Sequence, residues 1–105
     1  MEFIHKNYLE KWTKMPFPKQ IANIGSEFFR AVSLREKGDL ENAQKSALRV
    51  LDLINLTIEA TGRKRRLFEI FRLKEVICDL FFGENIYKTD TEKLKNYFLN
   101  FALLK

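Results

Sequence analysis

Three glycines divide this chain at nearly even intervals and mark where its helices end. Gly38, Gly62 and Gly83 each follow a stretch in which apolar residues recur every three or four positions. Glycine adopts positive φ freely, and a residue with positive φ commonly ends a helix. We therefore expect each of the three to take positive φ and to open a short turn between antiparallel helices.

The composition is that of one folded domain. The chain has 105 residues, of which 46% are hydrophobic, with ten Phe, two Pro and four Gly. A disordered segment is poor in aromatic residues and rich in Pro and Gly, so this chain favours a packed core. No low-complexity segment divides it, and we expect residues 1–105 to form a single domain.

Apolar periodicity predicts an all-α fold. The pattern indicates a short helix over residues 3–14, a second over 18–37, a third over 40–61, a fourth over 64–82, and a last one after the polar loop 84–89. Alternation typical of strands is not evident. We expect an antiparallel helical bundle of four main helices plus a short N-terminal helix. The fourth helix should be central, because its apolar face is wide: Leu67, Ile70, Phe71, Leu73, Ile77, Leu80 and Phe81.

Local signals support these boundaries. Asp39 precedes the third helix, where its carboxylate can accept from free backbone amides. Thr89 and Glu92 have the spacing of a capping box at the start of the last helix. Gly25 falls inside the second helix, where it costs about 1 kcal/mol relative to alanine. We expect another helix to pack closely there.

A basic run begins the fourth helix and is a candidate binding site. Arg63, Lys64, Arg65 and Arg66 are consecutive, in a chain of net charge +5. Cations at a helix N-terminus oppose the helix dipole, so contact with phosphate or another acidic partner is one explanation. Arg72 and Lys74 follow on the same helix and would assist. The alternative is a solvated turn, which is common for short charge runs.

A polar stripe on the same helix is a second candidate. Its members, at three- and four-residue spacings, are Glu69, Arg72, Glu75 and Asp79. Paired carboxylates can bind a cation or perform acid–base chemistry. The alternative is a ladder of ion pairs along a solvated face, which the arginine within the set favours.

Other catalytic or metal-binding patterns are not evident. Cys78 is the single cysteine and lies in an apolar run, which favours a buried, inert thiol and excludes an internal disulfide. His5 is the single histidine and is best interpreted as an exposed or capping residue. Phosphate-cradling glycine loops and the G-x-S-x-G nucleophile motif do not occur. We therefore expect no enzyme of a familiar class, no cofactor and no metal.

The surplus of phenylalanine suggests a protein partner. Phe28-Phe29 and Phe81-Phe82 are adjacent pairs, and one helix cannot direct both members of a pair at one core. Either the bundle wraps both members of each pair, or a second chain, a different protein or a second copy in a homodimer, covers one face.

Two segments carry resemblances. Gly38 to Ala43, followed by Ala47-Leu48, resembles the turn and second helix of a tetratricopeptide repeat, although no second copy follows. Residues 23–28 and 72–85 are similar to short bacterial helical proteins of unassigned function. That resemblance implies a helical fold and a bacterial cytoplasmic source, and it brings no activity with it. The start of the chain lacks a signal-peptide pattern, and no apolar stretch is long enough for a membrane span.

These observations predict a non-enzymatic helical interaction module of the bacterial cytoplasm that self-associates or binds a protein. One alternative is a nucleic-acid-binding protein that uses the basic run 63–66. The other is a carboxylate-based cation or catalytic site on the helix 64–82.

Overall fold

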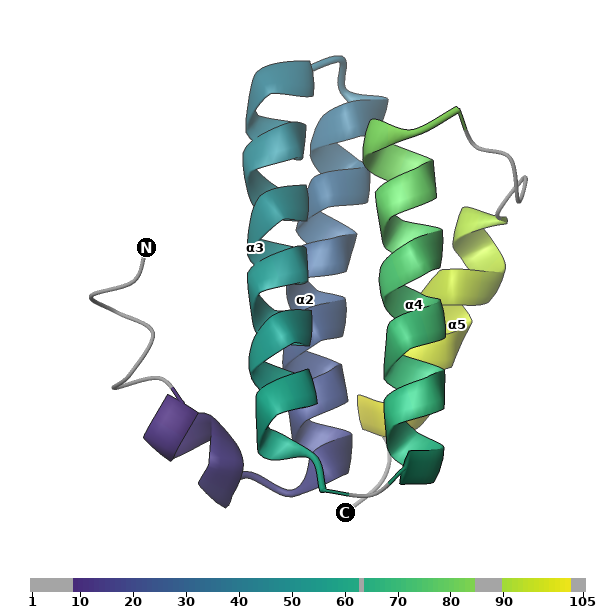
Figure 1. Cartoon of the computed structure of the whole chain (residues 1–105). Helices are drawn as coiled ribbons and strands as arrows, with labels where there is room; N and C mark the ends of the chain where they lie inside the picture. Colours follow the sequence, from purple (N-terminus) through teal and green to yellow (C-terminus); the bar gives the residue numbers. More distant parts are fainter. Residues whose placement is uncertain (1–8, 63, 85–89, 103–105) are drawn as a thin grey trace.

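The computed structural model describes residues 9–62, 64–84 and 90–102, and these residues are helices joined by short turns (Figure 1). A short helix over 9–14 precedes four long ones: α2 (Phe17–Glu36), α3 (Leu40–Ala60), α4 (Lys64–Phe82) and α5 (Thr91–Ala102). The all-α prediction is confirmed, and each predicted main helix is present within one residue at the ends described. Residues 3–8, where the first helix was expected to begin, lie outside the described residues, as does His5.

The helices form an up-down-up-down bundle with one open side. Figure 1 shows α2 and α3 as an antiparallel hairpin, and α4, which packs against α3, runs antiparallel to α3. Close packing joins α2 to α3, α2 to α5 and α3 to α4, whereas the described parts of α4 and α5 have little backbone contact. The expectation that α4 is central is therefore wrong. The helices α2 and α3 each pack closely on two neighbours, whereas α4 packs closely on α3 alone.

Phenylalanine rings form the middle of the core. Phe28 on α2 is fully buried, and its ring centroid lies 5.2 Å from that of Phe98 on α5 and 6.1 Å from that of Phe81 on α4. Aromatic pairs at such distances add to the stabilisation from area burial alone. Phe28 thus links three helices. The other large apolar side chains that are fully buried are Phe98, Ile21, Ile24, Val50, Ile54, Ile70 and Ile77.

Gly25 permits the close approach of α5 to α2. A Cβ atom placed on Gly25 would lie 2.6 Å from Cβ of Phe98 and 2.8 Å from its Cγ. The prediction that another helix packs against this glycine is confirmed, and α5 is that helix.

The three helix-ending glycines differ in conformation. Gly38 has φ of 84°, as expected, whereas Gly62 and Gly83 do not have positive φ. The prediction is wrong at those two because the chain leaves the helices differently. Thr61 turns out of α3 in an extended conformation, with φ −92° and ψ 124°. At Gly83 the requirement is space, since a Cβ there would lie 3.0 Å from Cα of Asp79.

Aspartates cap two of the helices. Asp39 accepts a hydrogen bond from the backbone N–H of Asn42 (3.3 Å), which confirms the predicted cap of α3. The side-chain amide of Asn42 also donates to the Asp39 carboxylate. The two hydrogen bonds, with that from the side chain having the larger effect, lower the pKa of Asp39. At α5, Asp90 accepts from the backbone N–H groups of Glu92 (2.9 Å) and Lys93 (3.4 Å). The cap therefore lies one residue later than predicted, and Thr89 lies outside the described residues.

The N-terminal helix is fixed to the bundle by two buried hydrogen bonds. The indole N–H of Trp12 donates to Oγ1 of Thr57 on α3 (2.7 Å). The side-chain amide of Gln20 on α2 donates to the carbonyl of Trp12 (2.7 Å). Burial removes the hydrogen bonds that the Trp12 indole and the Gln20 amide would make to water. The two hydrogen bonds within the protein replace them, and so they determine where the N-terminal helix packs on the bundle.

Candidate interaction surface on α4

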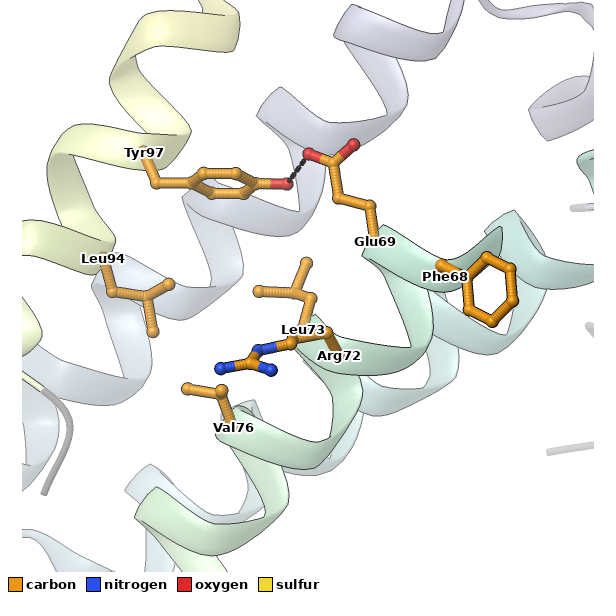
Figure 2. Close-up of a pocket in the computed structure, with 7 residues that line it drawn as sticks. All are labelled: Phe68, Glu69, Arg72, Leu73, Val76, Leu94 and Tyr97. Atoms are coloured by element: carbon orange, nitrogen blue, oxygen red, sulfur yellow. Dashed lines mark hydrogen bonds between the residues drawn. The ribbon is translucent and has the colours of Figure 1, made fainter. Parts of the chain in front are cut away.

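The open side of the bundle contains an apolar groove between α4 and α5 (Figure 2). Its volume is about 430 Å³. Its floor is Leu73 and Val76 on α4, with Leu94 on α5 opposite. Because α4 and α5 do not pack closely along their length, these side chains line a groove instead of closing a core. The complete lining is Phe68, Glu69, Arg72, Leu73, Val76, Leu94 and Tyr97.

One hydrogen bond spans the groove. The hydroxyl of Tyr97 donates to Oε1 of Glu69 at 2.7 Å, and Figure 2 shows this bond joining the two helices. Burial, and then the bond and the negative charge of Glu69, raise the pKa of Tyr97 well above its ordinary value. The phenol therefore keeps its proton and its hydrogen bond to Glu69, and this bond holds α4 and α5 at their spacing.

The members of the predicted polar stripe lie in different surroundings. An α-helix turns about 100° per residue, so Glu69 and Glu75 project about 120° apart. The carboxylate of Glu69 is used in the bond to Tyr97, whereas Glu75 is exposed and Asp79 is half-buried further along α4. Within the described residues, no three His, Cys, Asp or Glu side chains are close enough together to hold a metal ion. The cation-site alternative gains no support from this arrangement.

The basic residues described also diverge. Arg66 places its guanidinium carbon 4.4 Å from the ring centroid of Phe17, a cation–π contact between α4 and the start of α2. Arg72 is exposed at the groove, and Lys74 is half-buried. Since residues two apart lie about 200° apart around a helix, Arg72 and Lys74 cannot share one face. Arg63 and the side chains of Lys64 and Arg65 lie outside the described residues, so phosphate binding by the run stays a prediction.

Three phenylalanines on α4 are exposed instead of packed. The exposed fraction is 78% for Phe68, 47% for Phe71 and 43% for Phe82. Phe71 was expected in the core, and this is wrong because the apolar stripe that packs inward is narrower: Ile70, Leu73, Ile77 and Leu80 are buried. The sequence signal for these rings was their surplus, including the adjacent pair Phe81-Phe82, whose first ring packs on Phe28.

The remaining predictions on this helix are partly corrected. Cys78 is a free thiol, as expected, but it is half-buried and not fully enclosed, because it lies on the flank of α4 between the core and the outer face.

No described helix combines the length and the low charge that crossing a membrane requires. Comparisons with protein-family models, curated proteins and solved structures found no match to this chain. The surface itself is therefore the guide to function.

Proposed function

We propose that this protein is a non-enzymatic helical interaction module that binds another polypeptide through the outer face of α4. The observation that carries the proposal is the exposure of Phe68, Phe71 and Phe82 on one helix. We infer a bacterial cytoplasmic setting, and what supports it is the resemblance of residues 23–28 and 72–85 to short bacterial helical proteins.

The exposed area is large for a small domain. From the fractions given above, the three rings leave on the order of 300 Å² of apolar surface in contact with water. The largest apolar patch of a monomeric protein is typically about 300–600 Å², and it is often functional. Burial of that area would contribute roughly 7 kcal/mol before the costs of association.

The groove extends the same surface. Phe68 borders both the outer face and the groove, so a partner that covers the ring can also contact the walls formed by Leu73, Val76 and Leu94. Arg72 lies exposed beside them and offers a cation to an acidic side chain. Apolar surface with a charged rim is the usual composition of a protein interface.

Site-specific photocrosslinking in cells tests this proposal. The photoreactive amino acid p-benzoylphenylalanine would replace Phe71, and in a matched control it would replace Leu48, which is 53% exposed on α3. We expect a discrete crosslinked product from position 71 that position 48 does not give. Equal products from the two positions, or no product from position 71, would contradict the proposal.

A further inference from the structure

The outer face of α4 carries the spacing of a coiled-coil seam. Five residues on this face follow one another at alternating intervals of three and four, which is the spacing of the a and d positions of a heptad repeat. We call this set the outer seam: Phe68, Phe71, Glu75, Cys78 and Phe82.

The outer seam points away from the core, with four exposed members and the half-buried Cys78 at its edge. Each of its first four residues precedes by two a residue buried in the bundle: Ile70, Leu73, Ile77 and Leu80. Two residues correspond to about 200° of rotation, so the seam and the buried stripe occupy opposite sides of α4. Figure 2 shows Phe68 projecting from α4 on the side away from Leu94 and Tyr97. One helix thus presents two packing surfaces, of which the bundle covers one.

We propose that a second copy of this chain covers the outer seam, with the two α4 helices antiparallel about a two-fold axis. This inference rests on the proposed function and names the partner. A closed dimer uses the same patch on both chains, and a two-fold axis allows either parallel or antiparallel helices. A parallel pair would place Glu75 against the partner's Glu75 in one layer, whereas an antiparallel pair separates the two carboxylates into different layers. In one register, Phe71 packs on the partner's Phe82, and Cys78 packs beside the partner's Glu75. Two-fold symmetry repeats both layers.

Charge complementarity selects this register. The flank of the seam that carries Arg72 also carries Asp79, seven residues later. A two-fold axis brings the same flank of both helices together, and the register that stacks Phe71 on the partner's Phe82 places Arg72 beside the partner's Asp79. The symmetric contact forms a second time. Residues that flank a coiled-coil seam determine partner choice and orientation in this way.

Glu75 limits the affinity of this dimer. It occupies the centre of the outer seam, where both copies bring a carboxylate toward the contact. A polar residue at a seam position fixes register at a cost in stability. Replacement of Glu75 by leucine should therefore tighten association, which distinguishes this dimer from one that uses a different face.

Sedimentation equilibrium of the purified full chain across the micromolar range tests the proposal. We expect a reversible dimer for the unmodified protein. Arg72→Asp and Asp79→Arg should each weaken it about tenfold, because each substitution turns two attractions into repulsions. The double variant R72D/D79R should restore the original affinity, and Glu75→Leu should tighten association about tenfold. Circular dichroism establishes that every variant is folded, and Arg49→Asp on α3 serves as the matched surface control.

Each outcome has a defined meaning. A dimer that both single variants weaken and the double variant restores supports the register. An unmodified protein that stays monomeric throughout overturns the inference, as does a dimer that the charge exchange does not restore. The photocrosslinking result separates this failure from failure of the proposed function. If the protein is monomeric but position 71 still crosslinks a different polypeptide, the proposed interaction surface on α4 stands. Only the inference that a second copy of this chain covers it is then overturned.

Discussion

Phe98 on α5 lies against the backbone of α2 at Gly25, so close that a Cβ at residue 25 would be 2.6 Å from Cβ of Phe98. We predict that Gly25→Ala destabilises the protein, although alanine favours a helix over glycine by about 1 kcal/mol. The atoms in contact are at the base of the Phe98 side chain, so α5 itself must shift. Such overpacking costs typically about 1–3 kcal/mol. Urea unfolding measures the difference.

The matched control for this prediction is Gly62→Ala. Nothing lies within 4 Å of a Cβ at Gly62, and its φ is not positive. Alanine there should leave the free energy of unfolding unchanged or raise it by about 0.4–1 kcal/mol, because it restricts the unfolded chain. If Gly25→Ala were as stable as Gly62→Ala, the close contact of α5 with α2 would be wrong.

A second prediction concerns the buried bond between Trp12 and Thr57. Thr57→Val keeps the shape of the side chain but removes the acceptor, which leaves the indole N–H buried without a partner. We expect a loss of about 1–3 kcal/mol in the free energy of unfolding. Thr57→Ser, which keeps the hydroxyl and loses a methyl group, should cost less, about 1 kcal/mol. Trp12 is the single tryptophan, so its fluorescence reports the same transition. Equal losses in the two variants would contradict a role for the hydrogen bond.

The sequence predicted the helix bounds best where a boundary has a local cause. Asp39 and Gly38 define the turn between α2 and α3 through backbone chemistry that neighbouring residues determine. The close packing at Gly25 was also predictable, because a glycine in mid-helix needs a reason. The open side of the bundle was not predictable. Apolar periodicity shows that Phe71 lies on a helix face, but the neighbours that cover that face come from distant parts of the chain.

The groove between α4 and α5 escaped sequence analysis for the same reason. Glu69 belonged to a stripe of charges on α4, and nothing in its own helix indicates that Tyr97, 28 residues later, donates to it. Likewise, the basic run predicts that Arg66 contacts a phosphate or an acidic partner, or lies in a solvated turn, and nothing in it indicates that the guanidinium lies over Phe17. Pairwise side-chain contacts between helices depend on helix order and rotation, which short-range patterns do not encode.

Tyr97 should give the protein a distinctive alkaline response. Burial and the bond to Glu69 raise its pKa above the ordinary value of 10.0, so the folded state retains the phenolic proton to higher pH than the unfolded chain does. The stability that this group contributes is complete below about pH 10 and is lost as pH rises further. Tyr97→Phe should reduce that decline, measured by urea unfolding at a series of pH values. A variant whose decline equals that of the unmodified protein would contradict the raised pKa. Absorbance of tyrosinate supplies an independent check.

The basic run at the start of α4 yields the last prediction, which tests nucleic-acid binding. If residues 63–66 contact phosphates, fluorescence polarisation with mixed DNA and RNA oligonucleotides should show binding that weakens steeply with salt, because bound counterions are released. Arg66 is engaged with Phe17, so Arg63, Lys64 and Arg65 should carry the effect. Their triple alanine variant should weaken the binding and reduce the salt slope by about 3. The control replaces three exposed cations elsewhere by alanine: Lys14, Lys37 and Arg49. The two triple variants therefore have the same net charge. Equal weakening in both variants would show a general effect of charge and would exclude a site at the run. Absence of binding at low salt would leave the outer face of α4 as the functional surface.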